Sequence, residues 1–116
     1  MARYVDSFLV PVRRQNFKAY QQIARLSAKA WIKYGALEYI ETVVHRTVKK
    51  GGKSPLLSDI TLSHDEVMVF GVVIYKSRTH RDRVVKKITQ DKKLLKMWDE
   101  LPFDSMRMIL DRFHEI

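Results

Sequence analysis

The longest apolar stretch of the chain, Val67 to Tyr75, reads VMVFGVVIY and carries no charge. A strand with one face in water alternates apolar and polar residues, whereas a strand covered on both faces is apolar throughout. The stretch therefore predicts a central strand with both faces covered. In a chain of 116 residues the predicted helices can cover only one side of a sheet, so we expect the other side to lie against a second subunit.

The strand segments predicted by residue pattern are Tyr4 to Val12, Leu37 to Thr47, Val67 to Tyr75 and Met106 to His114. The first is apolar on both faces except at Asp6 and Ser7, and Pro11 limits its ladder near one end. The second mixes β-branched and aromatic residues with charged ones, which is typical of a protected edge strand. The last follows a turn predicted at residues 101–105.

Two regions have a helical pattern. Apolar residues within 17–34 recur at spacings of three and four, which indicates an amphipathic helix. Asn16 is its expected N-cap and Gly35 its C-terminal stop. A second helix is expected after Ser77 as N-cap, and Asp91 can cap a short helix that follows it.

The predicted order of elements is strand, helix, strand, strand, helix, strand, with a long loop at residues 48–64. Two interleaved right-handed strand-helix-strand units give an α+β fold, the ferredoxin-like βαββαβ sandwich with antiparallel sheet order 4-1-3-2. This order places the two most apolar strands in the middle. We expect residues 1–116 to form a single domain, and its second apolar sheet face predicts a homodimer that forms a dimeric α/β barrel.

The composition excludes several kinds of site. The chain has no cysteine, which rules out disulfide frameworks, thiolate zinc sites and cysteine nucleophiles. Its four histidines lack the spacing of metal ligands, and no glycine-rich loop opens a helix, so neither a metal nor another cofactor is expected. No apolar run approaches the roughly 20 residues that span a bilayer, and no secretory signal pattern is present. A cytoplasmic protein without membrane contact is the expectation.

Basic residues gather on the predicted helices. The formal net charge is +9, which favours anionic partners through long-range attraction. Nucleic acid can meet such a surface through phosphate contacts alone, without reading base sequence. A merely solvated basic helix exterior is the alternative interpretation. The candidate polyanion-binding residues are Arg13, Lys18, Arg25, Lys29, Lys33, Arg78, Arg83 and Lys87.

Four segments carry a resemblance to a known family, namely YVDSF at 4–8, YGALEYIE at 34–41, VFGVVIYKSRTHRDRV at 69–84 and LPFDSMRMI at 101–109. Through them the chain resembles the YbaA-like bacterial family of unknown function, in the dimeric α/β-barrel superfamily. The resemblance implies that fold, and the superfamily includes cofactor-independent monooxygenases and small-molecule isomerases. The chain departs from the family at three places. The family usually has Asp-Gly where this chain has Asp6-Ser7, paired acids where it has His45-Arg46, and Gly-Gly-Phe where it has Asp111-Arg112-Phe113. Metal binding through the paired acids is therefore not expected here.

Asp6 is the acidic residue most out of place, because its strand is otherwise apolar and an unpaired buried carboxylate is costly. One interpretation is structural, with Arg107 or backbone amides satisfying the carboxylate. The other makes Asp6 a general base or ligand anchor in a sheet-lined cavity. Arg81 and Asp82 are expected to form ion pairs with a neighbouring element.

Four aromatic or acidic residues are further candidates for the same cavity. Tyr39 and Glu41 share one face of their strand and either line the cavity or form a solvated edge pair. Trp31 and Tyr34 close the apolar stripe of the first helix, which belongs to the core or to a ligand-binding crevice. The pocket-lining candidates are thus Asp6, Trp31, Tyr34, Tyr39, Glu41 and Arg107.

The leading function hypothesis is small-molecule binding between the helices and the sheet of a homodimer. The sequence contains no compact catalytic motif, so whether a reaction is catalysed is left open. Binding of nucleic acid or another polyanion through the basic helical face is the alternative hypothesis. A dimer whose role is protein interaction without catalysis is the third.

Overall fold

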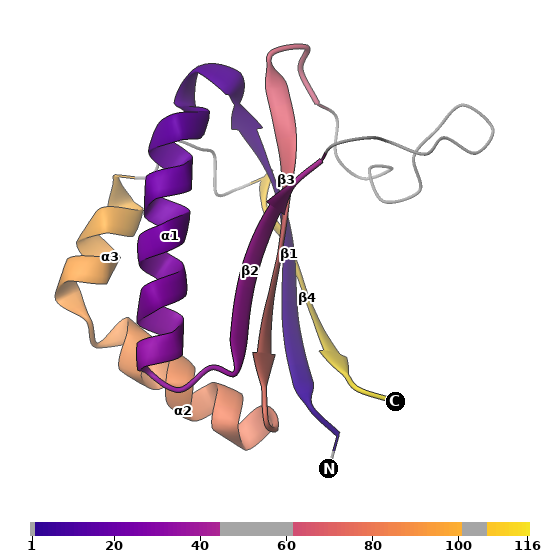
Figure 1. Ribbon diagram of the computed structural model, residues 1–116, viewed down its shortest axis with the longest axis vertical. Coiled ribbons are helices and arrows are strands. Elements are labelled where there is room, and N and C mark those ends of the chain that lie inside the picture. Colours follow the sequence, from indigo (N-terminus) through magenta and orange to yellow (C-terminus); the bar gives the residue numbers. More distant parts are fainter. Residues whose placement is uncertain (1, 45–61, 101–106) are drawn as a thin grey trace.

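The structure, a computed structural model, describes residues 2–44, 62–100 and 107–116. Its elements are β1 (Tyr4–Arg13), the short 3₁₀ turn η1 (Arg14–Asn16), α1 (Phe17–Lys33), β2 (Glu38–Val43), β3 (Glu66–Tyr75), α2 (Arg78–Thr89), α3 (Lys92–Asp99) and β4 (Ile109–His114) (Figure 1). This order confirms the predicted succession of strands and helices. Most of the loop predicted at 48–64 lies outside the described residues, as do His45, Arg46 and the turn predicted at 101–105.

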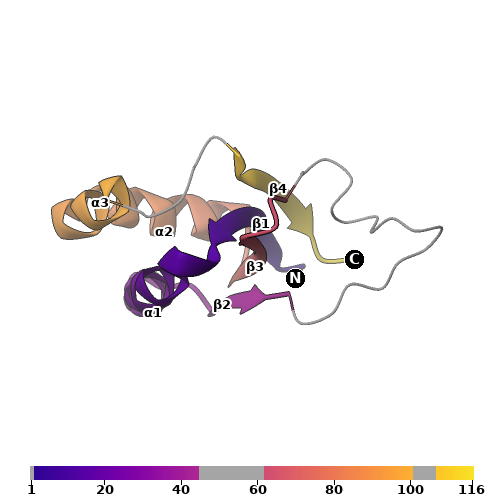
Figure 2. The same cartoon turned by 90° about the horizontal axis from the view of Figure 1, so that it is seen from above.

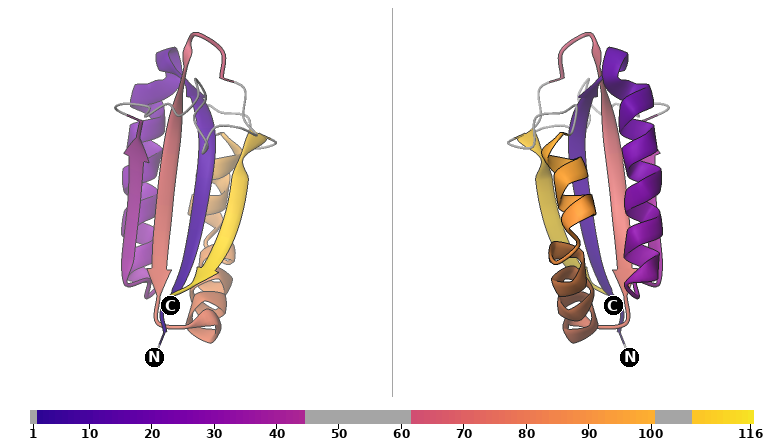
Figure 3. Two further views of the ribbon diagram at one scale, coloured as in Figure 1. Left: turned by 90° about the vertical axis from the view of Figure 1, so that its right-hand side faces the viewer. Right: turned by 90° about the vertical axis from the view of Figure 1, so that its left-hand side faces the viewer.

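The strands form one antiparallel sheet in the order β2-β3-β1-β4. This is the predicted 4-1-3-2 order, read from the opposite edge. Helices α1, α2 and α3 all lie on one face of the sheet, with α1 beside β2 and β3 and the other two behind β1 and β4 (Figures 2 and 3). The ferredoxin-like α+β prediction is confirmed.

The core lies between the sheet and the helices and is divided into two clusters. The first contains Tyr4, Ala36, Val73, Tyr75, Val84, Ile88 and Leu94, and the second contains Val10, Val12, Tyr20 and Val69. Even-numbered residues of β1 from Tyr4 to Val12 point toward the helices, because side chains alternate along a strand. Asp6 therefore stands on β1 between the two clusters, opposite Val73 of β3. A charged group thus interrupts the apolar core at this position.

The start of α1 agrees with the prediction in position but not in its capping hydrogen bond. Asn16 has helical backbone angles, φ −100° and ψ 0°, and its side chain makes no capping hydrogen bond to the helix. An N-cap residue usually has an extended backbone. Asn16 is the N-cap residue of α1, as predicted, but its side chain does not cap the helix, because the 3₁₀ turn of residues 14–16 already leads the chain into it.

The other helix boundaries agree with the sequence. Gly35 follows α1 with a φ of +116°, and the N–H groups of Gly35 and Ala36 donate back to carbonyls of the last turn. This is the pattern of a Schellman C-cap, in which glycine avoids the strain that a side chain would bring. The side chains of Ser77 and Asp91 accept capping bonds at the starts of α2 and α3, so both predicted caps are confirmed.

The sheet face away from the helices is apolar. Ile40, Phe70 and Phe113 alternate onto this face from β2, β3 and β4, with 48%, 42% and 52% of their surface exposed. Val72 and Ile74 of β3 share the face and are half-buried. An apolar surface of this kind on a single chain is typical of an interaction site.

Glu66 lies on the same sheet face and pairs with Arg107. The guanidinium donates from Nη1 to Oε2 over 2.6 Å and from Nη2 to Oε1 over 3.1 Å. These bonds, with one from the Ser63 N–H, lower the pKa of Glu66 to about 2. The expected pairing of Arg107 with Asp6 was therefore wrong. Strand register explains the difference, because Arg112 is opposite Asp6 and Arg107 precedes the start of β4.

Candidate ligand-binding site

A cavity of about 430 Å³ lies between the helix layer and the sheet. Its volume is within the range of roughly 300–1,000 Å³ that is usual for small-molecule sites. The described residues that line it include Asp6, Phe8, Tyr39, Glu41, Val73 and Tyr75 from the sheet, and Tyr20, Ala24, Ser27, Trp31, Arg81 and Trp98 from the helices.

Gly71 of β3 leaves space for the ring of Phe8, which lines the cavity on its sheet side. Phe8 is its direct neighbour on β1, and a Cβ added at Gly71 would lie 2.2 Å from the Phe8 ζ carbon. A side chain at residue 71 would have to displace the Phe8 ring, so glycine allows this ring to lie across β3. Glu41 is the neighbour of Gly71 on β2. The Phe8 ring therefore covers the sheet surface that leads toward Glu41.

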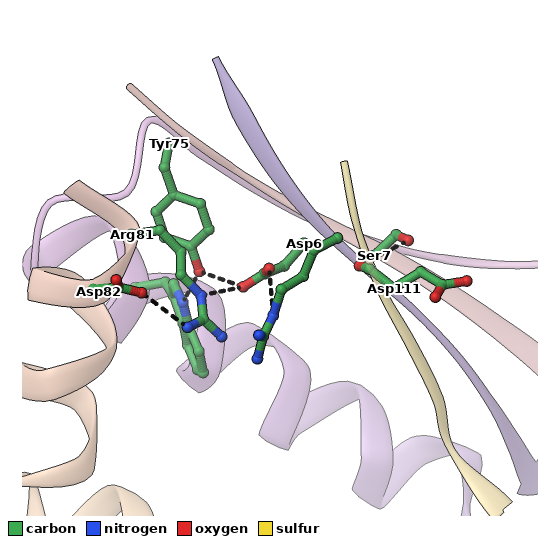
Figure 4. A network of polar contacts seen from close by, with 8 residues as sticks. Asp6, Ser7, Tyr75, Arg81, Asp82 and Asp111 are labelled. Carbon is green, nitrogen blue, oxygen red and sulfur yellow. Dashed lines mark hydrogen bonds and ion pairs between the residues drawn. The ribbon is translucent and has the colours of Figure 1, made fainter. Parts of the chain in front are cut away.

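Asp6 anchors a polar network under α2 (Figure 4). Its Oδ2 accepts hydrogen bonds from Arg81 Nε at 3.0 Å and from Tyr75 Oη at 3.3 Å. Tyr75 Oη in turn accepts from Trp31 Nε1 at 2.9 Å, and Arg81 Nη1 donates to Asp82 Oδ1 at 3.2 Å. The carboxylate is thereby tied to α1 and α2 at once.

The second oxygen of Asp6 is less well satisfied. Oδ1 is buried and is the one buried side-chain polar atom, among the residues that the structure describes, without a hydrogen-bond partner. Arg112 Nε lies 3.6 Å away, which is an ion pair but too long for a good hydrogen bond. Oδ1 therefore keeps hydrogen-bonding capacity that the described residues do not use.

Glu41 is held by two tyrosines. Tyr20 Oη of α1 donates to Oε1, and Tyr39 Oη of β2 donates to Oε2 at 2.8 Å. Burial and the negative charge of Glu41 raise the pKa values of both tyrosines. Both phenols are therefore protonated donors across the physiological pH range.

Aromatic side chains form the helix side of the cavity. The ring of Trp31 lies 5.3 Å from that of Tyr39 and 5.2 Å from that of Trp98, measured between centroids. Trp98 Nε1 donates to Ser27 Oγ at 3.0 Å, which fixes α3 against α1. Hydrogen bonds to Trp31 and Asp6 hold Tyr75 in the same way. Burial is the largest cause that raises the pKa of Tyr75. The helix side of the cavity is therefore mostly apolar, and hydrogen bonds within the protein hold its aromatic rings in place.

The structure places four of the six candidate pocket residues on the cavity, namely Asp6, Trp31, Tyr39 and Glu41. Arg107 and Tyr34 are not among its described lining residues. Tyr34 is the C-cap of α1, and its Oη donates to Asp91 Oδ2 at 2.7 Å. Tyr34 packs against the first core cluster, as Trp31 does, so it belongs to the core and not to the cavity lining.

Sequence reasoning missed several lining residues, chiefly Tyr20, Tyr75, Arg81, Ser27 and Trp98. Tyr20 and Ser27 belong to the predicted apolar stripe of α1, and Tyr75 ends the apolar run, so both patterns placed them in the core. The expected ion pair of Arg81 exists, with Asp6 as its partner. The sequence signal that could have identified these lining residues was a side chain with a polar group, such as Ser27 or Tyr75, in an otherwise apolar pattern.

The basic residues proposed for polyanion binding are all exposed. Lys18, Arg25, Lys29 and Lys33 are separated by seven, four and four positions, which places them along one side of α1. No acidic residue occurs in α1, Phe17–Lys33. Arg83 and Lys87 are one helical turn apart on α2.

Two kinds of site are not seen in the described part of the chain. Residues 2–44, 62–100 and 107–116 contain no group of three or more His, Cys, Asp or Glu side chains that could hold a metal ion. Within the same ranges, every helix is too short or too polar to cross a membrane.

The chain is similar in fold to solved structures. One of them is a dimeric ferredoxin-like protein from an uncultured marine organism, with a TM-score of 0.57 and 9% sequence identity. The match covers 98% of this chain and 94% of the other. At this identity the likeness concerns the fold alone.

Sequence comparison identifies relatives over nearly the full length. The uncharacterized protein YbaA of Escherichia coli strain K12 is 29% identical over 114 residues, which are 98% of this chain and 97% of the relative. The uncharacterized protein YbaA of Shigella flexneri matches to the same extent. A family profile described as a protein of unknown function, DUF1428, matches residues 3–105. The chain therefore belongs to the DUF1428 family, in agreement with its resemblance to YbaA-like proteins.

Proposed function

We propose that the protein binds a small organic molecule in the cavity between its helices and its sheet. The supporting observation is that one cavity of about 430 Å³ combines aromatic walls with two carboxylates held by fixed hydrogen bonds. Small-molecule sites are mostly apolar and contain a few placed polar groups, which orient the ligand. The cavity has both properties.

Asp6 has the role of a ligand anchor in this proposal. The carboxylate of a buried aspartate needs compensation, and Arg81 and Tyr75 provide it at Oδ2 of Asp6. Oδ1 is left to an incoming donor. A role of Asp6 as general base is the further hypothesis, and it requires a ligand whose acidic proton comes within hydrogen-bond reach of Oδ1.

The binding unit is proposed to be a homodimer joined through the open sheet face. Ile40, Phe70 and Phe113 supply the apolar surface on one chain, and a second copy supplies a matching one. The marine structure of similar fold is described as dimeric. Dimerisation through this face leaves the cavity accessible, because the cavity lies on the opposite side of the sheet.

A second candidate function is nonspecific polyanion binding along α1. The exposed stripe of Lys18, Arg25, Lys29 and Lys33 without an acidic neighbour on the helix supports it. Phosphate contacts release counterions, so affinity for duplex DNA should fall with a log-log salt slope of about −0.9 per contact. Charge reversal at Lys29 and Lys33 should flatten this slope in anisotropy titrations. Undetectable binding at low salt would remove this candidate.

A cavity-filling variant tests the leading proposal. Ala24 of α1 borders the cavity, so Ala24→Phe should occupy the space that a ligand needs. Ala19→Phe places the same ring on an exposed position of the same helix and is the matched control. Aromatic fragments should raise the melting temperature of the wild type and Ala19→Phe but not of folded Ala24→Phe. Equal stabilisation of all three proteins would mean that fragments bind elsewhere.

A further inference from the structure

The donors on the aromatic side chains of the cavity are already used within the protein. The pairs, donor first, are Trp31 to Tyr75, Tyr75 to Asp6, Tyr20 to Glu41, Tyr39 to Glu41 and Trp98 to Ser27. An indole or phenol has a single polar hydrogen, so each of these groups has none left to offer. A ligand that relies on acceptor atoms finds no donor on these side chains.

Acceptor capacity, in contrast, is abundant. Asp6 Oδ1 has no hydrogen bond, and each oxygen of Glu41 receives one tyrosine donor although a carboxylate oxygen can accept two. Burying such acceptors under a ligand without donors would carry a desolvation penalty. Arg81 keeps further N–H groups, but Asp6 and Asp82 balance its charge. The cavity therefore selects ligands that bring donors.

The charged groups that line the cavity also favour a ligand that brings hydrogen-bond donors. Asp6 and Glu41 contribute two carboxylates, against one guanidinium from Arg81. Asp6 has basic partners in Arg81 and Arg112, whereas none of the ion pairs found among the described residues includes Glu41. The negative charge of Glu41, which has no ion-pair partner among the described residues, is therefore suited to a cationic ligand group.

We propose that the ligand is an organic cation, an amine with an apolar body. Its ammonium lies against Glu41 and its body lies on Phe8, beside the rings of Trp31 and Trp98. The faces of tryptophan and tyrosine attract cations, and a primary ammonium supplies three donors. This inference rests on the proposed function, because it names the ligand class of the same cavity.

Three probes of similar size and different charge test the inference. They are 2-phenylethylamine, which is a cation at neutral pH, 2-phenylethanol, which is neutral, and 3-phenylpropionate, which is an anion. The chain has two tryptophans, and both border the cavity, so the two indole N–H signals in a ¹⁵N NMR spectrum report occupancy directly. The amine should shift both signals and bind about tenfold more tightly than the alcohol, the difference expected of a charge-assisted bond.

Charge neutralisation identifies the partner of the ammonium. Glu41→Gln keeps an acceptor oxygen for one of the two tyrosines, places an amide NH2 beside the other and removes the charge, and it should reduce amine affinity to about that of the alcohol. Glu38→Gln is the matched control, because Glu38 is exposed and alternates onto the opposite face of β2. It removes the same formal charge from the same strand and should leave amine affinity unchanged.

The outcomes separate the two proposals. Stronger binding of the alcohol or of 3-phenylpropionate, with both indole signals shifted, would overturn the cation inference and leave small-molecule binding standing. Equal loss of amine affinity in Glu41→Gln and Glu38→Gln would also overturn it, since it would indicate a general field effect. If none of the three probes shifts the indole signals, the cation inference fails, and the fragment test with Ala24→Phe decides on the cavity itself.

Discussion

The guanidinium of Arg81 and the carboxylate of Asp6 join the helix layer to the centre of the sheet, with 3.0 Å between Nε and Oδ2. Their side chains are 17% and 12% exposed, so both charges are largely removed from water. Removal of either partner leaves the other charge buried, which costs more free energy than the pair itself contributes. The pair thus links the docking of α2 to the floor of the cavity.

The first prediction concerns this pair. Asp6→Asn should lower the free energy of unfolding by about 1–3 kcal/mol, because the buried guanidinium loses a charged partner. Asp82→Asn, which removes the exposed partner of the same guanidinium, should change it by no more than about 0.5 kcal/mol. Urea unfolding monitored by fluorescence measures both. Equal effects of the two substitutions would contradict the assignment of Asp6 as the principal partner.

The second prediction concerns the close approach of Gly71 and Phe8. Gly71→Ala should displace the Phe8 ring from β3 and destabilise the protein by about 1–3 kcal/mol, the usual range for overpacking. The double variant with Phe8→Leu should recover part of that loss, since the smaller side chain no longer needs the space. If thermal unfolding shows that the changes in stability caused by Gly71→Ala and Phe8→Leu are strictly additive in the double variant, the two residues do not contact each other.

The third prediction is a pH dependence. The bonds from Arg107 lower the pKa of Glu66 from its ordinary 4.5 to about 2, so the folded state holds this carboxylate ionised where the unfolded chain protonates it. The stabilisation is complete above pH 4.5 and is lost as the pH falls toward 2.

Glu66→Gln should accordingly weaken the acid dependence of stability within that window. Because Arg107 is 35% exposed, screening reduces the expected difference to about 1 kcal/mol. Denaturant unfolding at several pH values, with Glu38→Gln as control, checks the effect. A wild-type curve that is no steeper than the Glu66→Gln curve between pH 4.5 and 2 would refute it.

The fourth prediction concerns assembly. The wild type should have twice the chain mass of 13.7 kDa in light scattering, and Phe70→Asp should give a monomer or fail to fold, since it places a charge in the proposed interface. Leu26→Asp, at an exposed position of α1, should leave the dimer intact. A monomeric wild type at micromolar concentration would rule out the sheet-to-sheet dimer.

The fold was largely predictable because the residue patterns that determine its elements lie within short stretches of the sequence. The lack of apolar-polar alternation in the stretches around Val5 and Val72 indicated strands apolar on both faces, and the ferredoxin-like order places those strands in the middle. Gly35, Ser77 and Asp91 act within a few residues of themselves, so their capping roles follow from sequence. The N-cap position of Asn16 was also predictable, but the absence of its side-chain capping bond was not, because the preceding 3₁₀ turn has no distinctive pattern.

The candidate site was predictable only in part because its geometry depends on long-range register. Asp6, Tyr39 and Glu41 could be placed on strand faces by counting residues. The choice between Arg107 and Arg81 as the partner of Asp6 depends on where β4 begins and how α2 docks, and neither is encoded near Asp6.

Crystals of the protein soaked with a set of small aromatic amines, alcohols and acids would test the existence of the binding site most directly. The predicted result is electron density for bound fragments in the cavity, over Phe8 and between Trp31 and Glu41, with the open sheet face occupied by a second chain. The contradicting result is a cavity closed by the Phe8 or Trp98 ring, with fragments found only on the outer surface.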